Sequence, residues 1–214
     1  MSQNVDVNAP LRSDQARQTL AATTIARSLF QAQIKARSLS VSSKNLSVVA
    51  VRIGEDAAGL AVLASFYDEL AKGTIRLANR IGELTADIAR LAVRQWQLAL
   101  VDQHLKKAME SMQRDRTQLI DEKRSTFVQD EKSMQVEFNA LMKKLESMLD
   151  EMKQQTQVIN VIAVNSKLEA TRVTTSRGTL NSMAKDIEST TQVVIELIEA
   201  AQHSLYSFQS GRML

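Results

Sequence analysis

The chain of 214 residues contains no cysteine, which excludes a disulfide framework, a thiolate nucleophile and a cysteine-ligated zinc site. Its single proline and six glycines leave room for very long helices, because these two residue types are the main interrupters of helix. Aromatic residues make up only 4% of the chain, whereas methionine occurs nine times. Such a composition suits thin seams between helices better than a thick mixed core.

Neither sign of charge dominates, since 27 basic and 24 acidic residues give a formal net charge of +3. The charges are mixed along the chain, so no basic stripe predicts binding to nucleic acid. No apolar run approaches the roughly 18 residues that a transmembrane helix needs, and the N-terminal segment lacks the apolar core of a signal peptide. We therefore expect a soluble, cytoplasmic protein with no membrane insertion.

What the chain does contain is a segment that occurs twice. Residues 45–64 read NLSVVAVRIGEDAAGLAVLA, and residues 165–184 read NSKLEATRVTTSRGTLNSMA. Each copy interrupts a long helical pattern once, at a short loop of small, hydroxyl and charged residues. A repeat of this kind predicts two copies of one helical hairpin. The identical pairs, all separated by 120 positions (165 − 45), are Asn45 and Asn165, Ala50 and Ala170, Arg52 and Arg172, Leu60 and Leu180, and Ala64 and Ala184.

Apolar and small residues in four segments recur at alternating steps of four and three, the seam spacing of coiled coils. The first segment follows an N-cap predicted at Ser13, and the second follows the glycines of residues 54–59. The first two seams are Ile25, Leu29, Ala32, Ala36 and Leu39, then Leu63, Tyr67, Leu70, Thr74, Leu77, Ile81, Leu84, Ile88 and Leu91. The other two are Met134, Phe138, Leu141, Leu145, Met148 and Met152, then Leu180, Met183, Ile187, Thr190, Val194, Leu197 and Ala201.

Seams this narrow do not keep single helices folded. We therefore expect an all-α fold, a long antiparallel four-helix bundle or coiled coil made of two pseudo-symmetric helical hairpins. The connection between the hairpins is predicted near residues 114–125, and the hairpins pair within a monomer or between the chains of a homodimer. The predicted parts are a flexible arm (residues 1–12) and a single bundle (13–214), which holds the hairpins (about 13–94 and 131–214) and a two-helix extension (about 95–130).

No residue pattern predicts an active site. The two histidines, His104 and His203, belong to no metal-ligand motif, and the glycine segment at 54–59 lacks the Lys-Ser/Thr pair that completes a phosphate-binding loop. No pair of carboxylates stands isolated on an apolar face. We expect a protein that is not an enzyme and that holds neither a metal nor a cofactor.

The predicted hairpin tips carry polar residues in an apolar setting. Asn165, Glu169 and Arg172 lie at i, i+4 and i+7 on one helix face, where Glu169 can pair with Arg172. One interpretation is an exposed helix end with a weak ion pair. The other is an interaction site, because the surrounding apolar residues cover a wider angle than one seam requires. These apolar residues are Val161, Ile162, Val164 and Leu168.

The stretch NVIAVNSKLEATR (residues 160–172) resembles the signalling tip of methyl-accepting chemotaxis proteins. The second copy matches that family's tip pattern by identity at Asn160, Ala163, Asn165, Glu169, Ala170 and Arg172. The first copy matches it at Asn45, Ala50, Arg52, Gly54, Glu55, Gly59, Ala61, Val62 and Ala64. The resemblance is direct over one short stretch of each hairpin, and both stretches coincide with predicted turns.

In that family the tip is a helical hairpin, two chains pair as a four-helix bundle, and the tip contacts partner proteins. The resemblance implies that this chain holds both hairpins in one polypeptide and acts as a soluble chemoreceptor-like signalling or scaffold protein. The implied partners are a chemotaxis coupling protein, a histidine kinase or chemoreceptor tips. The implied partner-binding residues are Asn45, Arg52, Glu55, Asn160, Ile162, Asn165, Glu169 and Arg172.

The chain departs from the family pattern at defined positions. Thr174 and Thr175 stand where the family has Gly-Glu, and Asp150 and Glu151 occupy small-residue positions of the methylation pattern. We therefore assign neither kinase control nor methylation. The alternative hypothesis is a purely structural or secretion-associated coiled-coil protein, whose likeness to receptors reflects only a helical bias to Ala, Glu and Arg.

Overall fold

A computed structural model of the chain describes residues 9–111, 118–173 and 177–209. Over these ranges the fold consists of four long α-helices and a single turn of 3-10 helix, with no strand. The all-α class predicted from the sequence is confirmed. The elements are α1 (Ala9–Ile53), the 3-10 turn η1 (Glu55–Ala57), α2 (Ala58–Ser111), α3 (Gln118–Arg172) and α4 (Arg177–Gln209).

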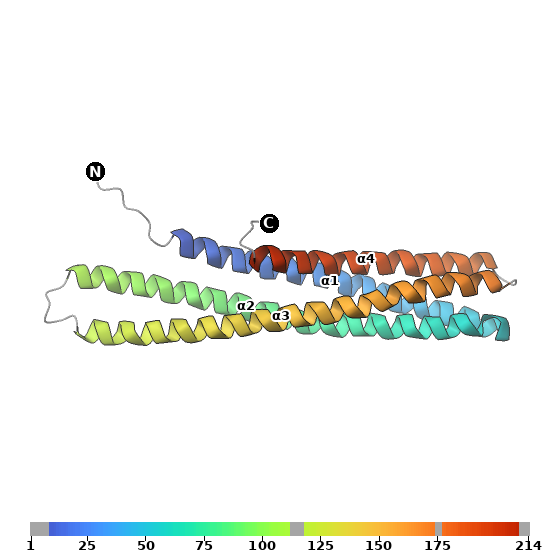
Figure 1. Cartoon of the computed structure of the whole chain (residues 1–214), viewed down its shortest axis with the longest axis horizontal. Coiled ribbons are helices and arrows are strands. Elements are labelled where there is room, and N and C mark those ends of the chain that lie inside the picture. The colour runs from blue at the N-terminus through green and yellow to red at the C-terminus, as the bar shows by residue number, and fades with distance from the viewer. Residues whose placement is uncertain (1–8, 112–117, 174–176, 210–214) are drawn as a thin grey trace.

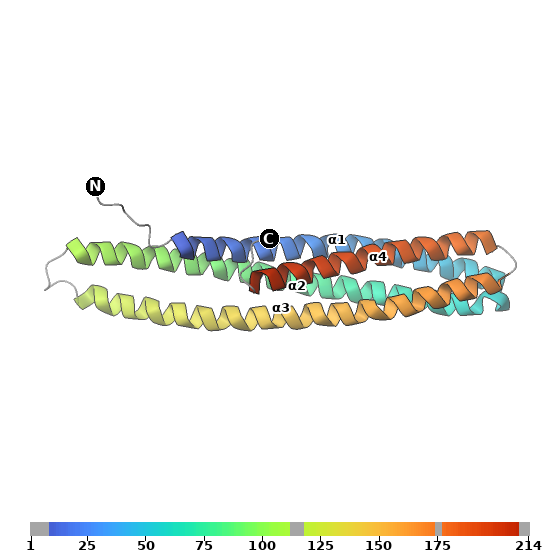
Figure 2. The same cartoon turned by 45° about the horizontal axis from the view of Figure 1, so that its top comes forward.

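The helices lie side by side in one long rod (Figures 1 and 2). Consecutive helices run in opposite directions, and α1 and α3 each pack against both α2 and α4. No contact between described residues joins α1 to α3, so these two helices lie diagonally across the rod. We call the end that carries η1 the closed end. At the opposite end, which we call the open end, α2 and α3 run on beyond α1 and α4 (Figure 1).

The chain reverses between α1 and α2 at Gly54. Its backbone has φ 93° and ψ −145°, a conformation that residues with a Cβ rarely adopt. The Gly54 N–H donates to the Ala50 carbonyl at 3.2 Å, and the Ala57 N–H donates to the Gly54 carbonyl at 3.0 Å. This glycine therefore ends α1 and sets the direction of the reversal.

Burial in α2 follows two rows of residues, each with a period of seven. The predicted seam contains four of the five residues of the larger row, all except Leu60. Its Leu77, Leu84 and Leu91 are buried as well, whereas its Leu63 and Leu70 are only partly buried and flank the core. The second buried row consists of small residues, which let neighbouring helices approach. The larger row is Leu60, Tyr67, Thr74, Ile81 and Ile88, and the small row is Ala64, Ala71, Ala78, Thr85 and Ala92. In α4 the rows are Leu180, Ile187, Val194 and Ala201, and Ala184, Thr191, Ile198 and Leu205.

The buried positions of the two hairpins correspond at the same offset that relates the repeated segments. The correspondence runs along the shaft as well as through the matched stretches, so both hairpins present equivalent faces to the core. Buried pairs include Leu29 and Leu149, Leu39 and Ile159, Ala50 and Ala170, Tyr67 and Ile187, and Ile81 and Ala201.

The apolar core is divided into two clusters along the rod. One, towards the closed end, includes Leu46, Leu60 and Ile159, and the other includes Leu29, Ile81 and Leu149. Three threonines fall between the clusters along α2, α3 and α4, namely Thr74, Thr156 and Thr191, each 2% exposed. The Thr156 hydroxyl donates to the Lys153 carbonyl at 2.7 Å, whereas the Thr191 hydroxyl meets no hydrogen-bond partner among the described residues. We call these residues the threonine layer.

The predicted start of the first helix is wrong by one turn. The helix α1 begins at Ala9 and not after Ser13, so residues 9–12 are helical and do not belong to a flexible arm. Pro10 is compatible with this, because the first turn of a helix leaves its N–H groups unbonded and proline has none to lose. Residues 1–8 lie outside the described ranges.

The predicted connection between the hairpins is also placed too late. The helix α3 begins at Gln118, so the second part of the segment predicted at 114–125 is helical. Glu122 to Arg124 sit on this helix because the charge-dense sequence, although poorly periodic, contains no residue that breaks a helix. Residues 112–117 lie outside the described ranges, as do 174–176 of the second turn.

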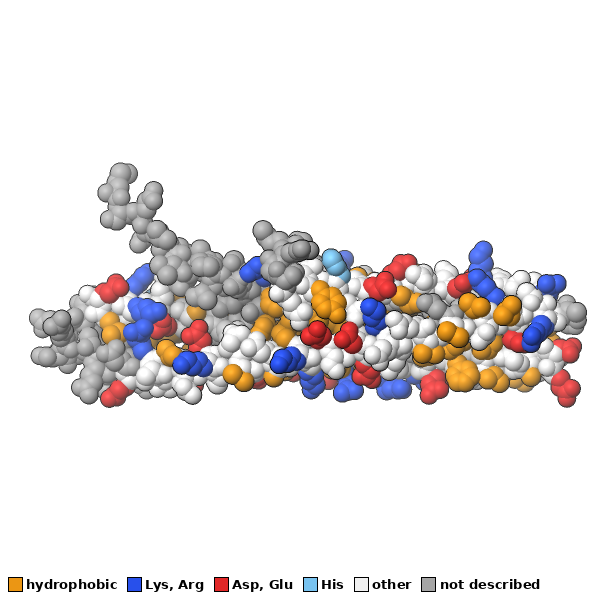
Figure 3. Space-filling view, viewed as in Figure 1, with side chains coloured by type: hydrophobic (Ala, Val, Ile, Leu, Met, Phe, Trp, Pro, Cys, Tyr) orange, Lys and Arg blue, Asp and Glu red, His pale blue; other side chains and the backbone are white. Residues whose placement is uncertain are grey.

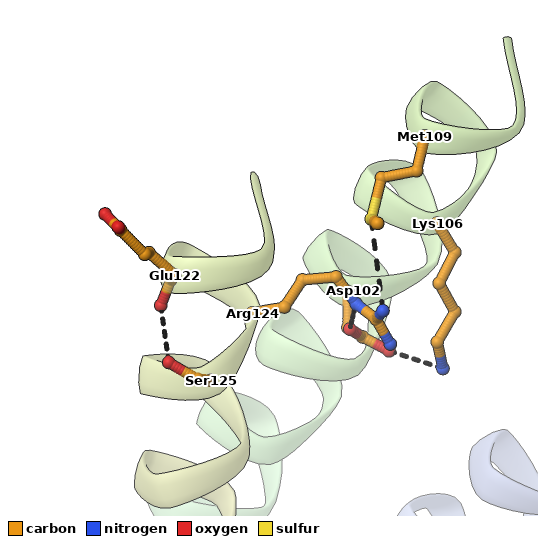
Figure 4. Close-up of polar contacts among 6 residues, drawn as sticks. All are labelled: Asp102, Lys106, Met109, Glu122, Arg124 and Ser125. Atoms are coloured by element: carbon orange, nitrogen blue, oxygen red, sulfur yellow. Dashed lines mark hydrogen bonds and ion pairs between the residues drawn. The ribbon is translucent and has the colours of Figure 1, made fainter. Parts of the chain in front are cut away.

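The projecting ends of α2 and α3 are joined through Asp102 (Figure 4). Its carboxylate accepts hydrogen bonds from Arg124 Nε of α3 at 3.0 Å and from Lys106 Nζ of its own helix at 2.6 Å. Burial is the largest single influence on the pKa of Asp102 and raises it. The hydrogen bonds and charges of Lys106 and Arg124 together outweigh burial and lower this pKa below its ordinary value.

Candidate partner-binding tip

The last turns of α1 carry an exposed line of residues at steps of four, three and four. Val41, Asn45, Val48 and Arg52 are all exposed, and the two valines keep 59% and 52% of their surface accessible. We call these four residues the α1 stripe. An exposed pair of valines beside an amide and a guanidinium has the composition of a contact surface and not of a solvated helix face.

The same line of residues recurs in α3 at the repeat offset. Val161, Asn165, Leu168 and Arg172 are exposed, with 63% and 56% of the Val161 and Leu168 surfaces accessible. We call them the α3 stripe. Each position therefore repeats the identical residue of the α1 stripe or, at Val48 and Leu168, one apolar residue for another. The duplication preserves an exposed surface as well as the buried seam.

The two stripes lie on opposite sides of the closed end. They belong to α1 and α3, the helices that are diagonal in the rod (Figure 2). A partner bound on one stripe would leave the other stripe open, so the arrangement has two equivalent faces.

Glu169 ties the α3 stripe to the start of α2. The Arg172 Nη1 donates to Glu169 Oε1 at 2.8 Å, which confirms the pairing predicted within the helix. The other oxygen of this carboxylate lies against Gly59, where an added Cβ would be only 2.8 Å from Glu169 Oε2. The Arg172 side chain keeps 73% of its surface accessible, so it is available for contact.

Three more charged groups border the closed end. Glu55 lies exposed in η1, at the reversal itself. On the other hairpin, Lys167 Nζ of α3 contacts Glu188 Oε1 of α4 at 2.7 Å. The closed end therefore carries both signs of charge around its apolar residues.

One predicted contact residue is wrong. Ile162 is 7% exposed and belongs to the core cluster near the closed end, so its side chain faces the core and not solvent. The side chain of Asn160 lies outside the described residues. The remaining predicted residues, Asn45, Arg52, Glu55, Asn165, Glu169 and Arg172, all reach the surface at least in part.

Sequence reasoning missed part of the apolar surface. Val51, Val62 and Phe66 are 69%, 57% and 49% exposed near the closed end. Figure 3 shows hydrophobic side chains gathered on this half of the rod, over α2 and α3. The signal was present in the sequence as apolar residues that fit neither row of a seam. The excess of exposed apolar surface predicted around Val161 and Val164 is confirmed, since both residues are at least 60% exposed.

Tyr67 lies buried beneath the tip with 0% exposure. Burial raises the pKa of its hydroxyl, the neighbouring Ser166 hydroxyl opposes this rise, and the negative charge of Glu188 adds to it. The Ser166 hydroxyl itself donates to the Ile162 carbonyl at 2.9 Å. The tip is therefore built over a polar group in the core, with no access from solvent.

The described residues contain no group of acidic or histidine side chains that could hold a metal ion. Nor does any helix in the described ranges have the length and apolar character needed to cross a membrane. Comparisons of the chain with protein-family models, with curated proteins and with solved structures return no match.

Proposed function

We propose that the chain is a chemoreceptor-like signalling or scaffold protein that binds partner proteins through the α1 and α3 stripes. The observation that supports this most directly is the exposed line of valine, asparagine, an aliphatic residue and arginine, which occurs in both hairpins. Outer positions of α1 and α3 that lie farther from the closed end do not match in this way, since Phe30 and Ile34 correspond to Asp150 and Gln154. The likeness at the tip therefore exceeds what the duplication alone preserves.

The chemistry of the stripes fits contact with protein. Exposed aliphatic residues supply apolar area, and asparagine and arginine supply directional hydrogen bonds at the rim. With two such faces on opposite sides, the molecule is bivalent and suited to link partners. The resemblance to chemoreceptor tips supplies the class of partner: a chemotaxis coupling protein, a histidine kinase or chemoreceptor tips.

Calorimetric titration tests this proposal directly. The chain is titrated with the coupling protein, the kinase and a receptor tip, and then the variants Arg52→Glu and Arg172→Glu are titrated singly and together. We expect two sites in the wild-type chain, one in each single variant and none in the double variant. The control variant is Arg94→Glu, an exposed arginine on the shaft of α2, which should bind as the wild type does.

Thermal unfolding of each variant separates binding from folding. Because Arg52 and Arg172 are exposed, the variants should unfold within a few degrees of the wild type. A chain that binds none of the three partners, or a double variant that binds normally, would reject the proposal. The alternative of a purely structural coiled coil would then stand.

A further inference from the structure

The outer face of α1 before the α1 stripe is apolar, and no helix of the described chain covers it. Leu20, Phe30 and Ile34 are 56%, 62% and 49% exposed. Leu20 and Ile34 are two heptads apart, and Phe30 lies one helical turn before Ile34, so the three share one side of the helix. We call them the shaft face. They continue the line of Val41 towards the open end of the rod.

The shaft face has no counterpart on the other hairpin. At the repeat offset, Phe30 and Ile34 correspond to Asp150 and Gln154 of α3, and Leu20 corresponds to Ala140. These apolar residues are therefore neither part of the shared bundle pattern nor a remnant of the duplication. A large aromatic and two branched aliphatic side chains stay in water on one hairpin only.

Along α1 itself, the charge beside the shaft face has one sign. Arg27 and Arg37 are exposed and interleave with its apolar residues along the helix. After Asp14, no acidic residue follows in α1. The basic residues of this helix are Arg12, Arg17, Arg27, Lys35, Arg37, Lys44 and Arg52.

We propose that the shaft face binds an amphipathic helix of a partner protein that carries glutamate or aspartate beside its apolar seam. Heptad-spaced apolar residues accept the knobs of such a helix, and Arg27 and Arg37 face its carboxylates. Charge complementarity of this kind selects the partner and speeds encounter. A second copy of α1 fits poorly, because it would bring two basic helices together.

The narrow width of its apolar line also distinguishes the shaft face from the apolar face of a membrane-binding helix. Helices that lie in a membrane interface bury a wide apolar sector among the lipids and keep a charged sector in water. The opposite side of α1 is already buried in the core through Leu29, Ala32 and Leu39, so only the narrow outer line is free. The shaft face shares no residue with the stripes, and the inference does not depend on the proposed function.

The test uses two synthetic helical peptides with the same leucine and isoleucine seam. One carries glutamate beside the seam and the other carries lysine. In fluorescence anisotropy titrations of the full chain, we expect the glutamate peptide to bind at least about tenfold more tightly, and added salt to weaken it. The double variant Phe30→Ser with Ile34→Ser should lose at least about tenfold in affinity.

Matched controls assign any loss to the shaft face. Val128 and Val136 on α3 are 43% and 70% exposed, and their replacement by serine should leave the titration unchanged. The variant Arg52→Glu with Arg172→Glu should also bind the peptide normally, which separates this inference from the tip. Circular dichroism checks that each variant keeps its helix content.

Four outcomes would overturn the inference. The first is equal affinity for the two peptides, and the second is undiminished binding by the Phe30→Ser, Ile34→Ser variant. A third is tight binding to vesicles that contain phosphatidylserine, lost in the same variant, which would make the face a membrane contact. The last is self-association of the wild-type chain in sedimentation equilibrium that this variant abolishes, which would make the occupant a second copy.

Discussion

At the scale of single residues, three glycines lie in three different local environments. Gly54 has a φ of 93°, so any Cβ there would be strained. Gly59 lies in a helix, but an added Cβ would meet the Glu169 carboxylate of α3. Gly82 meets neither constraint, since no atom lies within 4 Å of an added Cβ. Glycine is therefore required for the backbone conformation at position 54, leaves room for the Glu169 side chain at position 59, and meets no such constraint at position 82.

Alanine at Gly54 and at Gly82 should shift stability in opposite directions. Gly54→Ala should lower the free energy of unfolding by about 1–3 kcal/mol, because the backbone conformation is nearly exclusive to glycine. Gly82→Ala should raise it by about 0.5–1 kcal/mol, because alanine has the higher helix propensity and the site has room. Urea unfolding followed by circular dichroism measures both. Equal effects in the two variants would contradict the assignment of Gly54.

At the scale of elements, the seam spacing predicts four long helices and much of the core, but it misses the row of small buried residues in α2. In α2, Tyr67, Thr74 and Ile81 are predicted and found buried. The second predicted row is Leu63, Leu70, Leu77, Leu84 and Leu91. Its last three residues are buried, whereas Leu63 and Leu70 are only partly buried and the core there holds the adjacent Ala64 and Ala71. In a helix with 3.6 residues per turn, either the leucine row or the adjacent row of small residues can face the core, and hydrophobicity alone favours the leucines. The distance between the helices determines that the alanines are buried, and this distance cannot be read from one sequence.

The same limit explains the candidate site. Asn165, Glu169 and Arg172 follow from spacing on one helix, so they could be predicted together, and the Glu169–Arg172 pair is observed. The prediction of Ile162 as a contact residue is wrong, because its exposure depends on how the neighbouring helices pack. The contact of Glu169 with Gly59 joins two helices, and no pattern within either helix predicts it.

The link between α2 and α3 at the open end should depend on pH. The pKa of Asp102 is lower in the folded chain than in the unfolded chain. Its stabilising contribution is therefore fully present above the unfolded pKa of about 3.9 and is lost as pH falls through the folded pKa. We expect Asp102→Asn to lower the free energy of unfolding at neutral pH by at most about 1 kcal/mol.

Thermal unfolding across the acid range measures this effect. The difference between the wild type and Asp102→Asn should shrink below about pH 4 and vanish at lower pH. Asp87 is a matched control, because it pairs with Arg90 on the surface of one helix and is 51% exposed. Asp87→Asn should change stability little at any pH. A difference for Asp102→Asn that grows on acidification would contradict the assigned role.

At the scale of the whole molecule, the diagonal position of α1 and α3 sets the separation of the two stripes. If the hairpins pair within one chain, this separation is fixed by the bundle and not by concentration. Helix axes about 10 Å apart place diagonal helices about 14 Å apart, before side chains are added. The chain contains no cysteine, so labels can be attached at chosen sites without first removing any.

Spin labels on Asn45→Cys and Asn165→Cys should give one narrow distance distribution. With the length of two labels added to the diagonal, we expect a distance of roughly 25–35 Å from pulsed electron resonance. Dilution of labelled with unlabelled chain should leave the distribution unchanged. A distance that disappears on dilution after refolding would indicate hairpins exchanged between chains, contrary to the single-chain bundle.

We expect the threonine layer to divide the rod into two cooperative units. Apolar contacts that would tie the halves together are interrupted at Thr74, Thr156 and Thr191, and the buried Thr191 hydroxyl adds a cost that no hydrogen bond among the described residues offsets. Local opening is cheapest where buried apolar contacts are fewest. We therefore expect the closed end to loosen or tighten while the rest of the rod stays folded, and we expect amide exchange to report different protection in the two halves.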